Sequence, residues 1–293
     1  MADLTIDIII PSLNSPLIAQ VVSMILAQER AELIGQIIIV GKDKEQLLKS
    51  NQEPRVTFID TGMAVPPATA RNIGIKAANS ELLIFLDSDC IPQEKWLSEH
   101  LVAHDAGHPV VGGGVLPDGE NYWALAYNLT MFHKYFSETT PGPRPFLPTL
   151  NLSIERKAIN EVGLLDESLP RSQDLDWTTR MNGSGFQPYF WPKATIQHQH
   201  NRTTLNKLWQ DCVRTGYYAR QARLTHQDIL KTPRWLRSRT LVLLLSPFIA
   251  AGVTGKILQT QPTVMKEHWR TIPAIYISKI AWCWGASRKG LAS

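Results

Sequence analysis

Two aspartates separated by one serine stand out in the segment ARNIGIKAANSELLIFLDSDCIP, residues 70–92. The apolar run Leu82–Leu86 predicts a buried strand, and Asp87 and Asp89 follow it directly. Side chains alternate along an extended segment, so we expect both carboxylates on one side and Ser88 on the other. Carboxylate oxygens suit hard divalent cations, which keep part of their shell for water and phosphate. The spacing predicts a cation site, with a solvated surface turn as the common alternative for any Asp-x-Asp.

Arg71 and Asn72 fall on an expected helix, residues 68–78, that precedes this strand. A guanidinium at that position could reach a diphosphate or a base. An ion pair with a nearby acid is the alternative, and without further context the two interpretations weigh about equally.

A second acidic cluster lies in RSQDLDWTTRMNGSGF, residues 171–186. Asp174 and Asp176 stand near the expected start of a helix, with Arg180 about one turn further on. A carboxylate at a helix N-terminus stays ionised because of the helix dipole and the free N–H groups. That position suits a helix cap and also a general base.

His198 and His200 close an extended segment, and alternation places both rings on one face. His198 could complete the shell of a metal, although a lone histidine pair is more often structural. The three cysteines, Cys90, Cys212 and Cys283, are too few and too far apart for a disulfide framework or a cysteine-based zinc site.

Strands and helices alternate through the first 86 residues. Apolar runs predict strands at 6–11, 36–40, 56–59 and 81–86, with helices at 16–30, 43–50 and 68–78 between them. This order predicts a parallel, doubly wound sheet, whose active site lies beyond the carboxyl ends of its strands. The residues at those ends are Ser12 and Asn14, Gly41 to Asp43, Asp60, and Asp87 to Asp89.

The remainder of the chain is mixed and then helical. We expect strands at 110–115 and 149–154, a helix at 121–136, a proline-rich loop at 137–148, and extended segments at 189–192 and 195–200. The expected division is a catalytic domain at 1–202, with a nucleotide-binding half at 1–115 and an acceptor half at 116–202. A C-terminal helical region follows at 203–293.

Charge is distributed unevenly along the 293 residues, which carry a net charge of +4. Residues 1–200 hold 15 basic and 23 acidic side chains, a balance of −8, and residues 201–293 hold 15 and 3, a balance of +12. Five of the nine tryptophans lie in the basic part. Such a segment could bind nucleic acid or an anionic membrane surface, and its apolar runs favour the membrane.

Two apolar segments, residues 240–257 and 271–287, fall near or below the roughly 20 residues of a spanning helix. Their basic and aromatic flanks fit interfacial helices or a shallow hairpin with both ends in the cytoplasm. Buried packing helices are the alternative. The flanking residues are Arg234, Trp235, Arg237, Arg239, Arg288 and Lys289.

Five markers in order resemble the family 2 glycosyltransferases, nucleotide-sugar-dependent enzymes, over residues 5–215. They are IIIPSLN at 8–14, ARNIGI at 70–75, FLDSDCIP at 85–92, LNLSIERKAINEVGLLDE at 150–167 and QDLDWTTR at 173–180. The resemblance implies an α/β GT-A fold, a Rossmann-like, mostly parallel sheet flanked by helices, followed here by a helical region expected to associate with a membrane.

The resemblance also implies a role for each matching residue. Asp89 would hold Mg²⁺ or Mn²⁺, and Asp174 would act as catalytic base on the acceptor hydroxyl. Asp87 and His198 remain further candidate metal ligands from their spacing alone. Gln173, Asp176 and Arg180 would face the acceptor. The nucleotide would contact Pro11, Ser12, Asn14, Asp43, Arg71, Asp87 and Ser88.

Three features depart from the family pattern. Gly41 and Lys42 stand where the family carries an acidic pair, so Asp43 would have to hold the base. Gln173 replaces the glutamate that precedes the catalytic aspartate. The Gln-x-x-Arg-Trp motif of processive synthases lacks its glutamine, because this chain has Lys231 there, so we expect transfer of single sugars.

The sequence therefore favours an inverting glycosyltransferase that acts at the cytoplasmic face of a membrane on a lipid-linked or cell-envelope acceptor, and no nucleic-acid partner. Gln173 and the altered 41–42 pair favour the alternative of a catalytically silent sugar-nucleotide-binding or scaffold protein. A metal-dependent nucleotidyltransferase is disfavoured, because Pro11-Ser12-Leu13-Asn14 is not a glycine-rich phosphate loop.

Overall fold

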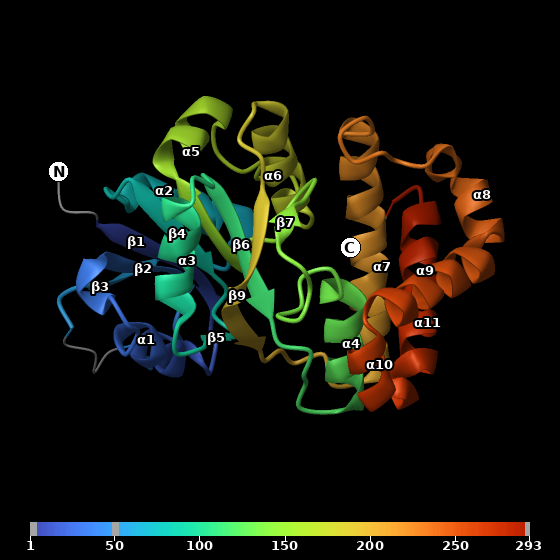
Figure 1. The fold of residues 1–293 in the computed structure, drawn as a ribbon, viewed down its shortest axis with the longest axis horizontal. Helices are drawn as coiled ribbons and strands as arrows, with labels where there is room; N and C mark the ends of the chain where they lie inside the picture. The colour runs from blue at the N-terminus through green and yellow to red at the C-terminus, as the bar shows by residue number, and fades with distance from the viewer. Residues whose placement is uncertain (1–4, 49–52, 291–293) are drawn as a thin grey trace. The chain divides into compact units, whose positions relative to one another are not determined.

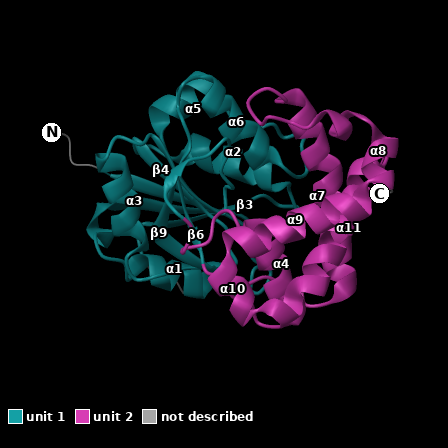
Figure 2. Ribbon diagram, turned by 45° about the vertical axis from the view of Figure 1, so that its right-hand side comes forward, with its two compact units in different colours: residues 1–115, 140–197 teal, residues 116–139, 198–293 magenta. Residues whose placement is uncertain are grey.

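The chain divides into two compact units, each described here by itself (Figure 2). A computed structural model describes residues 5–48 and 53–290. Unit 1 comprises the chain up to Val115 and the segment Thr140–Gln197. Unit 2 comprises Leu116–Thr139 and the chain from His198 onward.

Unit 1 is a mixed β-sheet flanked by helices (Figure 1). The strand order is β3-β2-β1-β4-β8-β6-β9-β5, and β7 pairs with β9. The strands are β1 Ile6–Leu13, β2 Ile34–Lys42, β3 Val56–Asp60, β4 Leu82–Leu86, β5 Cys90–Pro92, β6 Val110–Val115, β7 Gly142–Pro143, β8 Asn151–Glu155 and β9 Tyr189–His198. The helices are α1 Ile18–Leu26, α2 Pro67–Ala77, α3 Trp96–Asp105, α5 Arg156–Val162 and α6 Gln173–Gly183.

The first four strands of this order are parallel, as the alternation of strands and helices predicts. Ile9 lies opposite Ile38 of β2 and Phe85 of β4, and these three side chains are fully buried. The sheet is mixed because β8 pairs antiparallel with both β4 and β6. The segment between β6 and β8 includes α4, Tyr122–Phe132, which belongs to unit 2.

Most predicted elements of unit 1 are confirmed, with two corrections. Residues 43–48 form turns rather than the start of a helix, because both carboxylate oxygens of Asp43 accept backbone N–H groups, from Leu47 at 3.1 Å and Leu48 at 3.0 Å. Residues 49 and 50 of that expected helix lie outside the described residues. The extended segments at 189–192 and 195–200 are joined into one strand, β9, which ends at His198 and leaves residues 199 and 200 outside it. The pairing of β9 with β6 shifts register between Gly113 and Gly114.

Unit 2 is a helical assembly that includes α4. The other helices are α7 Leu205–Thr225, α8 Arg239–Leu244, α9 Ser246–Thr260, α10 Pro262–Glu267 and α11 Ile272–Ser287. Leu129 of α4 and the nearby Phe136 share a buried cluster with Ile257, Val264, Met265 and Ile275. Since α4 buries its apolar face here, the structure groups it with the C-terminal helices, whereas the sequence analysis placed residues 116–202 together.

The packing of α7 on α11 in unit 2 depends on two glycines. A Cβ at Gly216 of α7 would lie 1.9 Å from the carbonyl oxygen of Trp282, and one at Gly285 of α11 would lie 1.9 Å from that of Val213. Only residues without a side chain allow two helix backbones to come this close. The two glycines therefore set the packing of α7 on α11.

The two apolar segments of the C-terminal region are now helices of known length. Residues 240–257 are divided between α8 and α9, and residues 271–287 correspond to α11, which has 16 residues. Over residues 5–48 and 53–290, no helix combines the length and apolar character needed to cross a bilayer.

Substituting either packing glycine should destabilise unit 2. We expect Gly216→Ala and Gly285→Ala each to lower the free energy of unfolding by about 1–3 kcal/mol or more, because a methyl group would meet a backbone carbonyl. Urea unfolding followed by circular dichroism measures the change.

Gly252→Ala and Gly255→Ala are matched controls on α9, where an added Cβ meets nothing within 4 Å. These should be neutral or stabilising by up to about 1 kcal/mol, because alanine is the better helix former. Equal losses at all four positions would show that the close approach of α7 and α11 is not what Gly216 and Gly285 provide.

Candidate active site

The carboxyl ends of β1 and β4 are fastened to each other. The Ser15 hydroxyl, just after β1, donates a hydrogen bond to the Ser88 carbonyl at 2.8 Å. Asn14 has a left-handed backbone, φ 52°, and its side-chain oxygen accepts the Lys44 N–H at 2.9 Å. Ser12 is buried and Pro11 half-buried at the end of β1. Three of the predicted nucleotide-contacting residues thus lie at the end of β1 or directly after it, beside the Asp-Ser-Asp segment.

The Asp-Ser-Asp segment is a turn rather than a continuation of β4. The Asp87 carbonyl accepts the Cys90 N–H at 3.0 Å, and residues 88 and 89 form the corner. Side chains alternate between two sides only along extended backbone. Strand alternation therefore does not place Asp87 and Asp89 on one side, and the reasoning behind that expectation is wrong. Asp87 is directed toward α2, and Asp89 precedes β5.

Asp87 is bound by Arg71 of α2. The Arg71 Nη2 donates to Asp87 Oδ1 at 2.6 Å, and the arginine side chain is only 3% exposed. The buried Nε and Nη1 of Arg71 have no hydrogen-bond partner among the described residues. A buried N–H group without a partner costs roughly 1–3 kcal/mol, so an anion that reached these donors would be stabilised there.

Helix α2 is held in place on both sides of Arg71. Gly74 packs on β1 so closely that a Cβ there would meet Ile9 at 2.5 Å. Asn72 is locked to the loop after α5: its amide donates to the Leu165 carbonyl at 2.9 Å and to Glu167 Oε1 at 2.8 Å, and its oxygen accepts the Leu165 N–H at 3.0 Å. Arg71 therefore has little freedom to leave Asp87.

Helix α6 is anchored to β4 by a tryptophan. Trp177 is fully buried, meets Phe85 edge-on at 5.4 Å and donates its indole N–H to the Gly163 carbonyl at 2.9 Å. Phe85 lies two residues before Asp87, and Asp174 lies three residues before Trp177. The contact between the two rings thus brings the first turn of α6 to the carboxyl end of β4.

Asp174 is partly buried in that first turn, close enough to Arg71 and Asp87 to respond to both charges. Burial raises the pKa of the Asp174 carboxyl; the Leu175 N–H, at 2.8 Å, and the Arg71 guanidinium oppose the shift, while the Asp87 carboxylate adds to it. The pKa thus lies above the usual aspartate value. A carboxylate that takes up a proton more readily is a better base.

The other predicted residues of α6 have structural partners. Arg180 donates to Asp176 at 2.9 Å and to the carbonyls of Val162 at 2.6 Å and Leu164 at 2.8 Å, so this pair joins α6 to the loop after α5. Gln173 is buried, and its side-chain oxygen has no partner within the described chain. Contact of these three residues with an acceptor remains a prediction.

The acids after β2 and β3 are also engaged. Lys42 binds Asp60 at 2.7 Å, and this hydrogen bond holds the pKa of the exposed Asp60 carboxyl below its usual value. Asp43 caps the turn that follows β2 with both of its oxygens. The structure thus gives Asp43 a local role, and its contact with a nucleotide base remains a prediction.

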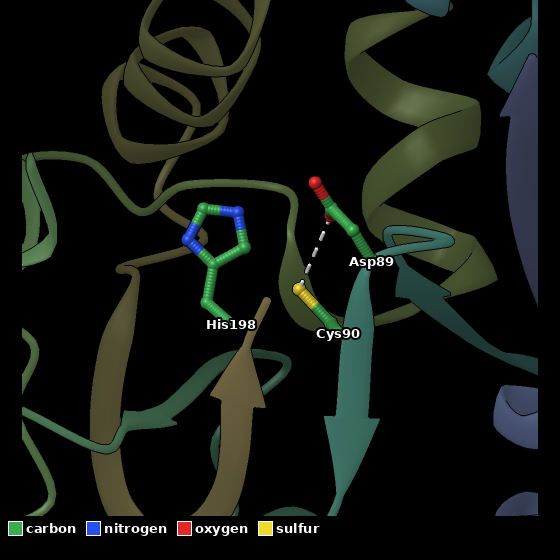
Figure 3. Close-up of side chains that lie close together, drawn as sticks. All are labelled: Asp89, Cys90 and His198. Atoms are coloured by element: carbon green, nitrogen blue, oxygen red, sulfur yellow. Dashed lines mark hydrogen bonds between the residues drawn. The ribbon is translucent and has the colours of Figure 1, made fainter. Parts of the chain in front are cut away.

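Asp89 stands beside the thiol of Cys90, at the start of β5 (Figure 3). The Cys90 sulfur donates to Asp89 Oδ1 at 3.9 Å, and burial, then the charges of Asp89 and Asp87, raise the pKa of the thiol. A neutral thiol is a poor metal ligand, whereas the Asp89 carboxylate suits Mg²⁺ or Mn²⁺. The donor chemistry thus fits a hard cation rather than a thiolate-bound metal.

His198 is the last residue of β9 and is the third side chain drawn in Figure 3. As the alternation predicts, its ring lies close to that of His200, with centroids 4.8 Å apart. Both rings contact α4: His198 meets Phe132 at 5.2 Å and His200 meets Tyr127 at 4.6 Å. His200 therefore packs on an aromatic ring, in keeping with the structural interpretation.

Two residues that matter to this arrangement were not identified from the sequence. Glu167 holds both Asn72 and Thr69 of α2, the latter at 2.8 Å. Asn128 of α4 bonds the ring of His198 at 2.9 Å. Glu167 could have been identified, because it lies in the family marker at 150–167. Nothing in the sequence around Asn128, inside an aromatic helix, indicates its role.

Replacing Asp174 should stabilise the protein in a pH-dependent way. Because burial raises its folded-state pKa above the unfolded value of about 3.9, the ionised carboxylate costs stability at neutral pH, and the cost disappears below that value. We expect Asp174→Asn to raise the melting temperature at pH 7 and to change it little near pH 3. Calorimetry at a series of pH values measures the difference.

Asp176→Asn is the control on the same helix. It should lower the melting temperature at pH 7, because it removes the 2.9 Å ion pair with Arg180. A loss of stability in both variants would contradict the cost assigned to the Asp174 carboxylate.

Curated relatives match part of the chain. A pre-mycofactocin glycosyltransferase of Mycobacterium tuberculosis is 31% identical over 147 residues, 47% of this chain and 31% of the relative. Glycosyltransferase AglE of Haloferax volcanii is 29% identical over 122 residues, 41% of this chain and 40% of the relative. The match thus spans 31% to 40% of the length of these relatives.

Solved structures match more of the chain at lower identity. The mannosyltransferase PcManGT from Pyrobaculum calidifontis, in complex with GDP-Man and Mn²⁺, is 14% identical with a TM-score of 0.58, over 94% of this chain and 85% of that one. GalNAc-T7 with UDP, GalNAc and Mn²⁺ is 14% identical with a TM-score of 0.56, over 79% of this chain and 52% of that one.

The family model of Glycosyl transferase family 2 matches residues 7–163, more than half of the chain. With a mixed sheet whose strand ends meet Arg71, Asp87 and Asp174, the chain belongs to glycosyl transferase family 2 and has the GT-A fold.

Proposed function

We propose that this chain transfers a single sugar from a nucleoside-diphosphate sugar to a hydroxyl of a lipid-linked or cell-envelope glycan acceptor, with inversion of the anomeric centre. Family membership supports the reaction class, and the geometry of unit 1 supports the residue roles. The observation that carries the proposal is that the contact between Trp177 and Phe85 brings Asp174, in the first turn of α6, to the end of β4, where Arg71 binds Asp87 at 2.6 Å.

Arg71 is the proposed anchor of the donor nucleotide. Its Nη2 is engaged by Asp87, and its other buried donors, Nε and Nη1, lack partners in the described chain. A diphosphate or base carbonyl offers the acceptors that these donors need. The proposed lining of the nucleotide pocket lies around the carboxyl end of β1 and consists of Pro11, Ser12, Asn14 and Ser88. Asp43, which follows β2, is proposed to line the same pocket.

Asp89 is the proposed first ligand of a divalent cation, with His198 and Asp87 as further donors. β5 neighbours β9 in the sheet, the Gln93 N–H donates to the Thr195 carbonyl at 3.0 Å, and His198 ends the same strand three residues later. An imidazole nitrogen beside carboxylates favours Mn²⁺ over Mg²⁺, which prefers oxygen ligands. When bound, the cation would neutralise the charge that develops on the leaving diphosphate.

Asp174 is the proposed general base. Its raised pKa comes from burial, and its position at the start of α6 leaves it beside the nucleotide-binding pair. It would accept the proton of the acceptor hydroxyl as that oxygen attacks the anomeric carbon and the nucleoside diphosphate leaves. One displacement inverts the anomeric centre and requires no nucleophile from the protein.

Donor binding and turnover should separate in two aspartate variants. We expect Asp89→Asn to lose most of the stabilisation that Mn²⁺ adds to binding of GDP or UDP, because it removes a carboxylate ligand. We expect Asp174→Asn to bind the diphosphates normally and to lose at least about a hundredfold in release of nucleoside diphosphate from its sugar nucleotide. Thermal shift and coupled diphosphate release over a panel of sugar nucleotides measure both.

Asp105→Asn is the matched control, since Asp105 is an exposed aspartate at the end of α3 in the same unit. It should leave both diphosphate binding and the release of nucleoside diphosphate unchanged.

Binding of GDP or UDP that is insensitive to Mn²⁺ and to Asp89→Asn would overturn the cation site. Binding without turnover in the unsubstituted protein, with lipid-linked and glycan acceptors present, would favour the silent sugar-nucleotide-binding alternative.

We further propose that unit 2 brings the enzyme to an anionic membrane surface. Helical hydrogen bonding continues from α8 into α9, with Leu245 N to Leu241 O and Ile249 N to Leu245 O both at 2.9 Å. An apolar stripe follows at positions i, i+3, i+4 and i+7, and its side chains are 36–75% exposed. It consists of Leu241, Leu244, Leu245 and Phe248.

Basic residues border the apolar stripe. Arg234, Arg237 and Arg239 are exposed just before it, and Asp211, Asp228 and Glu267 are the only acids of residues 201–293. Apolar side chains that enter the acyl boundary beside arginines that meet lipid phosphates are typical of an interfacial helix. A membrane surface is also where a lipid-linked acceptor would be found.

Removing the apolar stripe should weaken membrane binding. We expect the double variant Leu244→Ser, Phe248→Ser to bind vesicles of phosphatidylcholine and phosphatidylglycerol at least about tenfold more weakly, because each large side chain contributes roughly 1.5–3 kcal/mol when buried. Binding of the unsubstituted protein should also fall with added salt. Co-sedimentation measures both.

Leu205→Ser is the control, since Leu205 is a 42% exposed leucine at the start of α7 in the same unit. It should leave vesicle binding unchanged. If the double variant bound as well as the unsubstituted protein, or if the stripe instead mediated self-association in solution, the membrane proposal would be wrong.

A further inference from the structure

Asn128 is a fully buried asparagine in the middle of α4, and it makes three hydrogen bonds. Its amide nitrogen donates to the carbonyls of Asp118 at 2.7 Å and His198 at 3.2 Å. Its oxygen lies 2.9 Å from Nδ1 of the His198 ring. All three bonds lie within unit 2, and one side chain thus holds both the backbone and the ring of His198.

These bonds determine which ring nitrogen of a neutral His198 carries the proton. The amide nitrogen can only donate and both of its contacts are carbonyl oxygens, so the amide orientation is fixed with its oxygen toward the ring. That oxygen can only accept, and Nδ1 must therefore be the donor. A neutral ring with its proton on Nδ1 carries its lone pair on Nε2.

The ring plane is fixed as well. Phe132 meets the His198 ring edge-on at 5.2 Å, with an interplanar angle of 86°, and Tyr127 lies at 6.4 Å. Both aromatic residues belong to α4, as Asn128 does. The start of this helix is fastened to the chain just beyond His198, because Asn121 caps it and donates to the Thr203 carbonyl at 3.1 Å.

We propose that Asn128 is a positioning residue that presents Nε2 of His198 as a metal ligand. The inference rests on the proposed role of His198 in the cation site. Histidines that bind metals generally donate their other ring N–H to an oxygen, which fixes the tautomer and the orientation of the ring, and loss of that partner typically costs 10- to 100-fold in metal affinity. Asn128 supplies such an oxygen from a rigid, buried helix.

The alternative is that Asn128 only ties two stretches of backbone together. Two substitutions separate these roles, because each removes the amide donors but only one removes the oxygen acceptor. Asn128→Leu loses all three bonds. Asn128→Asp loses the donors to Asp118 and His198 yet keeps an oxygen for the Nδ1 proton.

We expect Asn128→Leu to weaken Mn²⁺ binding by about 10- to 100-fold and Asn128→Asp to remain within about threefold of the unsubstituted protein. Electron paramagnetic resonance of free Mn²⁺, with the metal as the only ligand, measures the affinity. Combining Asn128→Leu with His198→Gln should add no loss beyond His198→Gln alone, since both act through one ligand.

The tautomer is measured separately, on the metal-free protein, by long-range ¹H–¹⁵N correlation, with the His198 signal assigned from His198→Gln. We expect the Nδ1–H form. Observation of the Nε2–H form would overturn the proposal, even if Asn128→Leu did not fold. Equal losses of Mn²⁺ affinity in Asn128→Leu and Asn128→Asp would also overturn it. If His198→Gln left Mn²⁺ affinity unchanged, the ligand role of His198 in the proposed function would fall instead, while the tautomer result would still stand.

Discussion

The ion pair between Arg71 and Asp87 is the interaction on which the candidate site depends. A buried guanidinium is tolerated only when its charge and its N–H groups find partners, and Asp87 satisfies one nitrogen at 2.6 Å while two others remain orphaned. The same pair lies beside Asp174, and its two charges act on that carboxyl in opposite directions. Burial decides the outcome, and the pKa of Asp174 rises.

The surrounding fold keeps this pair in place by contacts remote from the chemistry. Gly74 lets α2 lie against Ile9, and Asn72 fixes the other side of the helix to Leu165 and Glu167. Trp177 fixes α6 to Phe85. The site is therefore supported by packing and by hydrogen bonds outside it, so its own charged groups can be arranged for a ligand rather than for stability.

Sequence patterns were sufficient to predict the parallel part of the sheet, because β1, β2 and β4 are continuous, largely buried apolar runs. They placed Asp87, Asp89 and Asp174 at element ends for the same reason. They did not predict that β8 would return antiparallel, since pairing direction depends on the path of residues 116–150 rather than on the strand itself.

Local pattern also failed where side-chain hydrogen bonds override it. Asp43 turns the chain after β2 by accepting two backbone N–H groups, although the residues that follow have helical spacing. Asp87 and Asp89 lie in a turn, so strand alternation does not apply to them. Periodicity could not identify Asn128, because its side chain bonds to residues 10 and 70 positions away in the sequence.

Anomalous diffraction from crystals grown with Mn²⁺ and a nucleoside diphosphate tests the central claim most directly. The account predicts a manganese peak at coordination distance from an Asp89 oxygen, with the nucleotide against Nε and Nη1 of Arg71. A peak held elsewhere, or a nucleotide bound away from Arg71 and Asp174, would contradict it.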